Sequence, residues 1–116
     1  MVLCQVNVRL FHSRLILSGK TETFIPMCIE LVNTGSELLL GHVLNTHQQW
    51  ICRELNNHGW DVARQVTVAD TGSAIEDAVR EGLSRAALVI TTGGLGPTTD
   101  DITRDRIAAL LGSELR

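Results

Sequence analysis

The segment 91–103 reads TTGGLGPTTDDIT and combines the residue types of a phosphate site with those of a metal site. Three glycines in four residues let the backbone take positive φ angles and approach a ligand closely. The amide groups of such a loop, together with the N-terminus of a following helix, form a cradle for an anion. Threonine hydroxyls add further donors. The residues assigned to this cradle are Thr92, Gly93, Gly94, Gly96 and Thr98.

Two adjacent carboxylates, Asp100 and Asp101, follow the glycines. They would repel a phosphate unless a cation lay between them, and carboxylate and phosphate oxygens are the ligands that Mg²⁺ prefers. We therefore predict a divalent metal held by Asp100 and Asp101. The alternative is that one aspartate caps the helix expected to begin near Ile102. The loop is not a Walker sequence, because no lysine follows its glycines.

A second group of candidates follows two earlier predicted strands. Gly35 and Glu37 stand after the first strand, and Asp70 stands after the second. The carboxyl ends of parallel strands share one edge of a sheet, where ligands of open α/β sheets bind. Glu37 is then a candidate metal or ribose ligand, and Asp70 is a further acidic candidate at the same edge. The alternatives are a solvated loop acid for Glu37 and a helix N-cap for Asp70.

Hydrophobic periodicity supplies the elements that position these residues. Apolar runs predict strands at 28–32, 60–68 and 87–90. Helical spacing predicts three helices. The first ends near Gly59 and has an apolar stripe of Leu44, Gln48, Ile51 and Leu55, and the second begins with the capping box Ser73–Glu76 and buries Ile75, Ala78, Val79, Gly82 and Leu83. The third ends at Gly112 and has an apolar stripe of Ile102, Ile107, Leu110 and Leu111. The alternation of strands and helices, with short connections, favours parallel crossovers and an α/β sandwich.

Composition limits the class of partner. The chain has 116 residues, a net charge of −3 and only 3% aromatic residues with no tyrosine. This balance argues against binding to nucleic acids or anionic membranes, whereas a weakly acidic protein can still bind a phosphorylated ligand at a local site. The three cysteines lack metal or disulfide spacing, and no apolar run is long enough for a membrane span. A cytoplasmic protein is the resulting expectation.

The sequence pattern also predicts that the folded domain begins near Met27. Residues 1–26 carry weak strand alternation at Val6, Val8 and Leu10 but no further α/β unit, so we assign them to an extension and residues 27–116 to the domain. Three parallel strands would leave two open sheet edges. The sequence therefore predicts either a homo-oligomer or further chain beyond residue 116.

Two motifs together resemble a known family. The segments MCIELVNTGSELLLG (27–41), VLNT (43–46) and TGGLGPTTDDIT (92–103) are similar to the N-terminal domain of CinA, the competence/damage-inducible proteins, which has the MoaB/Mog molybdopterin-binding fold. The resemblance implies a three-layer α/β/α domain with a mostly parallel sheet. It also implies that the family domain continues beyond Gly112, so that its C-terminal part is missing here.

The same resemblance implies functions. Mog-type relatives bind molybdopterin and adenylylate it with ATP and Mg²⁺, whereas CinA relatives are associated with metal-dependent ADP-ribose pyrophosphatase activity and carry a deamidase in a separate C-terminal domain. By motif, Asp101 falls on an essential aspartate of Mog proteins, and Asp70 falls on a second acidic position. The resemblance therefore implies that Asp101 and Asp70 are the catalytic residues. Asp100 replaces a basic residue usual in Mog, which favours the CinA branch.

Three hypotheses follow for this chain. It is a metal-dependent hydrolase of a dinucleotide pyrophosphate such as ADP-ribose, or a module that binds a pterin or nucleotide without chemistry, or a fragment that folds poorly. In the first two, the partner is a small nucleotide or pterin phosphate.

Overall fold

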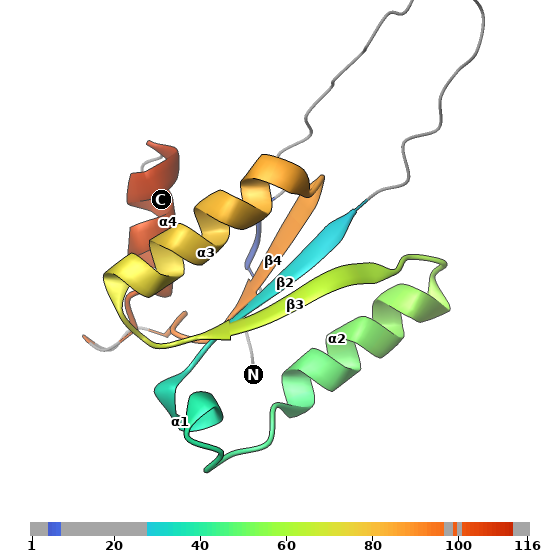
Figure 1. Ribbon diagram of the computed structural model, residues 1–116, viewed down its shortest axis with the longest axis horizontal. Helices are drawn as coiled ribbons and strands as arrows, with labels where there is room; N and C mark the ends of the chain where they lie inside the picture. Colours follow the sequence, from blue (N-terminus) through green and yellow to red (C-terminus); the bar gives the residue numbers. More distant parts are fainter. Residues whose placement is uncertain (1–4, 8–27, 97–98, 100, 113–116) are drawn as a thin grey trace, which may run out of the picture.

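The computed structural model describes residues 5–7, 28–96, 99 and 101–112 (Figure 1). Within these residues the order of elements is β1 (Gln5–Asn7), β2 (Ile29–Thr34), α1 (Ser36–Leu39), α2 (Thr46–Asn57), β3 (Val62–Val68), α3 (Gly72–Arg85), β4 (Leu88–Thr92) and α4 (Thr103–Leu111). From β2 onward helices separate the strands, as hydrophobic periodicity predicts. The short helix α1 was not predicted, because its residues were expected to form a loop. Gly112 ends α4 in the left-handed conformation, with φ +64°.

The sheet runs in the order β1-β4-β2-β3. β2 is central and pairs in parallel with both β3 and β4, so the chain crosses over β2 between those two strands. The predicted mostly parallel sheet is confirmed. β1 pairs antiparallel with β4, with Gln5 opposite Thr91 and Asn7 opposite Val89. The segment expected to be an extension thus contributes a short edge strand.

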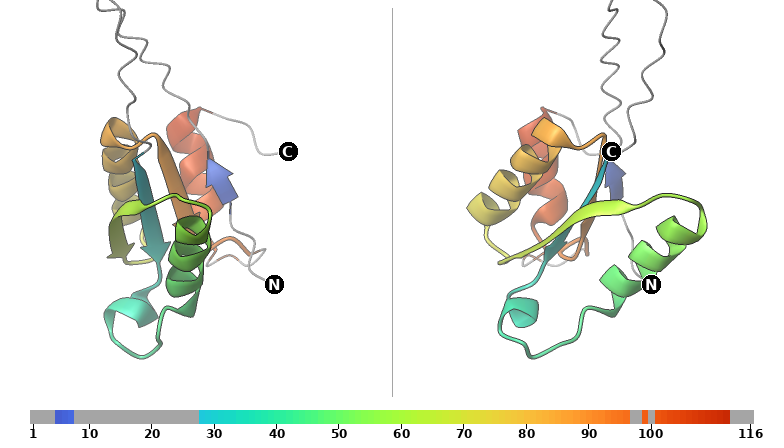
Figure 2. Two further views of the ribbon diagram at one scale, coloured as in Figure 1. Left: turned by 90° about the vertical axis from the view of Figure 1, so that its right-hand side faces the viewer. Right: turned by 45° about the vertical axis from the view of Figure 1, so that its right-hand side comes forward.

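Alternate residues of β2 face opposite helical layers. Ile29 and Leu31 pack with Ile51 of α2 and Ile90 of β4, whereas Val32 packs with residues on and after α3. Figure 2 shows the sheet with α2 on one side and α3 on the other. Because both faces are covered, every residue of β2 is buried. The predicted three-layer α/β/α architecture is confirmed.

α3 and α4 pack against each other through a separate apolar cluster. Ile75 and Val79 of α3 meet Ile107 of α4, and all three are at most 2% exposed. The predicted apolar stripe of α3 is confirmed, because Ile75, Val79 and Gly82 are buried on it. This contact holds the middle of α4 against α3.

Two predicted helix beginnings are wrong by two residues. α2 begins at Thr46 with Asn45 as its N-cap, so Leu44 precedes the helix and is 86% exposed. α3 begins before Ser73, because the Thr71 hydroxyl accepts a hydrogen bond from the Ala74 amide at 3.4 Å. The Thr71 hydroxyl bonds one of the free amides in the first turn of α3, as the predicted cap Ser73 would have done from two residues later. A capping-box pattern alone therefore does not determine the residue at which a helix begins.

A buried ion pair joins the central strand to α3. Glu30 of β2 is 2% exposed, and Arg85 donates to both of its carboxylate oxygens, with Nη2 at 3.1 Å from Oε2. The hydrogen bond to Glu30 raises the pKa of the Arg85 guanidinium. Gly82 leaves room for the carboxylate, since a Cβ there would stand 3.3 Å from Glu30 Oε2 and 3.0 Å from Val89.

None of the helices in the described part of the chain is long and apolar enough to cross a membrane.

Candidate functional site

The carboxyl ends of β2, β3 and β4 lie at one edge of the sheet, as predicted. The register pairs Thr34 with Val68 and Asn33 with Thr92, so the three strands end side by side. Gly35 follows β2, Asp70 follows β3 after one residue, and Gly93 follows β4. The loops that carry the predicted site residues therefore leave the sheet together.

Asp70 joins two of these loops. Its Oδ2 accepts a hydrogen bond from the Ser36 amide at 3.2 Å, and its own amide donates to Ser36 Oγ at 3.4 Å. The Gly35 amide donates to the Val68 carbonyl oxygen at 3.0 Å. The alternative assignment of Asp70 as an N-cap is wrong, because Thr71 holds that position on α3. The catalytic role of Asp70 stays a prediction.

Glu37 lies in the first turn of α1 and is exposed. Its side chain folds back over Gly35, where a Cβ would stand 2.8 Å from Glu37 Oε1. A side chain at position 35 would displace the carboxylate from this edge. The structure thus brings Gly35 and Glu37 together at the carboxyl edge, next to Asp70.

The glycine loop packs against its supports without space for side chains. Gly93 and Gly94 have φ angles of +88° and +62°, the region that favours glycine. A Cβ on Gly93 would meet the carbonyl oxygen of Thr34, and one on Gly94 would meet Oγ1 of Thr103, each closer than a real Cβ can approach. Both glycines are therefore required by the fold, whatever ligand the loop binds.

A buried pair of hydroxyls holds this loop from within. Thr34 Oγ1 donates to the Thr92 carbonyl oxygen at 3.2 Å and also lies 3.2 Å from Thr103 Oγ1. A hydroxyl has one hydrogen, so Thr103 donates to Thr34. The Thr103 amide in turn donates to the Gly94 carbonyl oxygen at 3.2 Å. Thr34 and Thr103 both lie within the two motifs, but no sequence pattern distinguishes them from the other threonines there.

Thr92 faces the opposite side of the sheet. Its hydroxyl donates to Asn33 Oδ1 at 2.8 Å, and Asn33 Nδ2 donates to Gln48 Oε1 of α2 at 2.9 Å. The hydroxyl hydrogen of Thr92 is thus engaged within the protein, in a network that ties α2 to the end of β4. Its predicted role as a ligand donor stays a prediction.

Asp101 lies close to Gly96, the last glycine of the loop. Its Oδ2 stands 2.5 Å from the position of a Cβ on Gly96, and the residue is half-buried. Asp101 directly precedes Ile102, the residue at the N-cap position of α4. Whether an aspartate caps this helix stays a prediction. Thr98 and Asp100 fall outside the described residues. Among those described, no three histidine, cysteine, aspartate or glutamate side chains group as a metal site.

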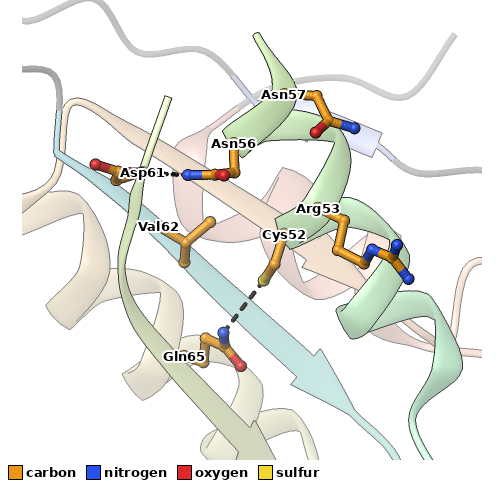
Figure 3. A pocket seen from close by; sticks show the side chains of 7 residues that line it. All are labelled: Cys52, Arg53, Asn56, Asn57, Asp61, Val62 and Gln65. Atoms are coloured by element: carbon orange, nitrogen blue, oxygen red, sulfur yellow. Dashed lines mark hydrogen bonds between the residues drawn. The ribbon is translucent and has the colours of Figure 1, made fainter. Parts of the chain in front are cut away.

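A pocket of about 520 Å³ lies elsewhere, between α2 and β3 (Figure 3). It is lined by Cys52, Arg53, Asn56, Asn57, Asp61, Val62 and Gln65. Gln65 Nε2 donates to Cys52 Sγ at 3.1 Å, and burial raises the pKa of that thiol. Val62 and Gln65 lie in the first half of β3, whereas Asp70 follows the other end of that strand. The pocket is therefore separate from the carboxyl edge.

Comparison with known families identifies the class of domain. The family model described as "Probable molybdopterin binding domain" matches residues 30–116. A "Putative competence-damage inducible protein" of Desulforudis audaxviator is 58% identical over 86 residues, which are 74% of this chain and 21% of that protein. A "CinA-like protein" of Akkermansia muciniphila is 46% identical over 87 residues, 75% of this chain and 21% of that protein. The chain spans about a fifth of the length of these relatives.

Solved structures give the same fold. The CinA protein of Thermoplasma acidophilum, described as of unknown function, superposes with a TM-score of 0.71 at 37% identity, over 77% of this chain and 53% of that one. The molybdopterin biosynthesis enzyme MoaB of Thermus thermophilus superposes with a TM-score of 0.68 at 23% identity, over 77% and 57% of the two chains. The predicted resemblance to the CinA and MoaB/Mog fold is confirmed.

Proposed function

Because this chain belongs to the family of probable molybdopterin binding domains, we propose that the carboxyl edge of its sheet binds the phosphate group of a pterin or nucleotide together with Mg²⁺. The observation that carries this proposal is the fixed glycine loop after β4. Gly93 and Gly94 take positive φ angles against Thr34 and Thr103, so the loop backbone has one defined path beside the N-terminus of α4. Such a loop needs little reorganisation to present amides to an anion.

The acidic residues fit a metal ion that is coordinated jointly by the protein and the phosphate of its ligand, and not by protein side chains alone. Asp101 is half-buried beside Gly96, and Glu37 and Asp70 lie at the same edge as exposed carboxylates. Mg²⁺ is commonly held by one or two carboxylates and by phosphate oxygens of the ligand. Asp101 and Asp100 are the residues that would hold it here. The cation would neutralise charge between these carboxylates and the phosphate.

Binding is tested by titration calorimetry of the 116-residue chain with ADP-ribose, with and without MgCl₂. We expect measurable binding only with Mg²⁺, and at least a tenfold weaker affinity for Asp101→Asn, which is about 1.4 kcal/mol. Asp105→Asn is the matched control, since Asp105 lies on α4 with a 63% exposed side chain and pairs only with Arg104 among the salt bridges of the described residues. Equal affinities for Asp101→Asn and the wild type would contradict the proposal.

Hydrolysis of ADP-ribose is the second candidate function. It is favoured because Glu37, Asp70 and Asp101 follow three different strands and lie at the same edge of the sheet. Water would attack one phosphorus of the pyrophosphate, Glu37 or Asp70 would take its proton, and the products would be AMP and ribose 5-phosphate. Release of AMP is followed by chromatography. We expect Asp101→Ala to abolish it and Asp70→Asn to reduce it while the melting temperature changes little, because an asparagine oxygen can still accept from the Ser36 amide. A wild-type chain that binds ADP-ribose and releases no AMP with any divalent metal is a binding module.

A further inference from the structure

Gln48 of α2 lies in the middle of a chain of side-chain hydrogen bonds that reaches the glycine loop. Its Oε1 accepts from Asn45 Nδ2 at 3.3 Å and from Asn33 Nδ2 at 2.9 Å. Asn33 of β2 is 0% exposed, and its Oδ1 accepts from the Thr92 hydroxyl at 2.8 Å. Thr92 ends β4 and directly precedes Gly93. One side chain of α2 is therefore connected to the start of the loop through a single buried amide group.

The N-cap of α2 determines the direction of every bond in this chain. The backbone amide of Gln48 can only donate, so the Asn45 atom that it meets at 3.0 Å is the oxygen. The other end of the Asn45 amide group is then a donor, and the Gln48 atom that faces it is an acceptor. Asn33 in turn offers its nitrogen to Gln48, so its oxygen faces Thr92. The Thr92 hydroxyl must therefore be the donor in the last bond of the chain.

Thr92 is held from two directions. Its hydroxyl donates to Asn33, while its carbonyl oxygen accepts from the buried Thr34 hydroxyl at 3.2 Å. That carbonyl group belongs to the peptide bond between Thr92 and Gly93, where the loop begins. Thr92 is only 4% exposed, and its one hydroxyl hydrogen is already used, so none is left to donate to a phosphate oxygen. These contacts fit a residue that places the backbone of the loop.

We propose that Gln48 is a positioning residue for the glycine loop, because it orients Asn33 and, through Asn33, the Thr92 hydroxyl. Without the Gln48 oxygen, the buried Asn33 nitrogen keeps the Val66 carbonyl oxygen, at 3.4 Å, as its partner among the described residues. The Asn33 amide group would then be less restrained and could turn its nitrogen toward Thr92. The effect on ligand affinity rests on the proposed function, whereas the effect on the loop itself needs no ligand.

The first test compares ¹H–¹⁵N NMR spectra of the 116-residue chain without ligand. Gln48→Met keeps the length of the side chain and removes its oxygen, and we expect it to shift the amide signals of Gly93 and Gly94. Gln49→Met is the matched control, since it makes the same change at the exposed neighbour on α2 and should leave both signals in place. Unchanged Gly93 and Gly94 signals in Gln48→Met, or equal shifts in Gln49→Met, overturn the proposal.

The second test measures the affinity for ADP-ribose with MgCl₂ by titration calorimetry. Gln48→Met should weaken binding about tenfold, whereas Gln48→Glu, which keeps an oxygen facing Asn33 and Asn45, should stay within about threefold of the wild type. In a Thr92→Val chain, which lacks the hydroxyl, Gln48→Met should weaken binding no further. Additive losses in this double-mutant cycle, or equal losses in Gln48→Met and Gln48→Glu, overturn the proposal.

The two measurements separate this inference from the proposed function. A wild-type chain that binds no ADP-ribose contradicts the proposed function, and the spectra then decide whether Gln48 positions the loop. A wild type and Gln48→Met that bind ADP-ribose equally well contradict the positioning role alone. Thermal melting identifies the variants that are folded at the temperature of measurement. If Gln48→Met is not, Gln48→Ala takes its place, because alanine also lacks the oxygen and favours the helix more strongly.

Discussion

Substitution of Gly94 by alanine tests whether the glycine loop is fixed by its supports. Gly94 has a φ angle of +62°, and a Cβ there would collide with Oγ1 of Thr103. Thr103 is 0% exposed, and its hydroxyl is bonded to that of Thr34. The obstructing atom therefore cannot turn away into solvent. The new methyl group must displace α4, the loop or both.

The expected cost has two parts. An alanine in the left-handed region costs about 1 kcal/mol, and forcing a methyl group into a packed site costs about 1–3 kcal/mol. Gly94→Ala should therefore lower the free energy of unfolding by about 2–4 kcal/mol. For a domain of this size, 1 kcal/mol lowers the melting temperature by about 4–8 °C, so the change should exceed about 8 °C.

Gly59→Ala provides the control for the backbone part alone. Gly59 has a φ angle of +81° after the end of α2, and nothing lies within 4 Å of a Cβ there. Its replacement should cost only about 1 kcal/mol in urea unfolding. Thr103→Ala removes the hydroxyl but keeps a Cβ 3.2 Å away, so the collision part should be smaller in that background, as a double-mutant cycle would show. Equal costs for Gly94→Ala and Gly59→Ala, or no relief by Thr103→Ala, would refute the argument.

Two further predictions concern other parts of the fold. Arg85→Met leaves the buried carboxylate of Glu30 without its cation and should lower the melting temperature clearly. Arg80→Met removes an exposed pair with Asp77 and should lower it much less; similar losses would contradict the importance of burying the carboxylate. Burial raises the pKa of the Cys52 thiol, so a smaller fraction of it is thiolate near pH 8. In a chain that retains only Cys52, the rate of reaction with iodoacetamide should therefore rise with pH around a midpoint above that of the same chain in 6 M urea. A midpoint in the folded chain at or below that of the unfolded chain would contradict this prediction.

Much of the fold follows from hydrophobic periodicity. The stripe of Ile75, Val79 and Gly82 identified α3, and the short apolar run before the glycine loop identified β4 as a buried strand. Strand order did not follow, because periodicity reports which face of an element is buried and not which strand lies beside it. The pairing of β1 with β4 also escaped prediction, since three residues carry too little pattern. Leu44 was wrongly predicted to lie on α2, because this exposed leucine continues the helical spacing of the apolar residues that follow it.

The position of the site was predictable for a topological reason. Parallel strands end at a common edge, so Gly35, Asp70 and the glycine loop had to approach one another once the strands were assigned correctly. The roles within the site were less accessible. Whether a threonine at the end of a strand faces the loop or the opposite layer depends on the register and on how α4 docks, and Thr34 and Thr92 face different layers.

The same contacts link the stability of the loop to the proposed function. An anion cradle is effective when its donors are held in place before the ligand arrives, because less order is then lost on binding. Here Thr34 and Thr103 supply that order from inside the protein, through the Thr92 and Gly94 carbonyl groups. A loop that is displaced by a methyl group at Gly94 should therefore bind ADP-ribose more weakly even at temperatures where the protein remains folded. Gly59→Ala, which leaves the loop in place, should bind it as the wild type does.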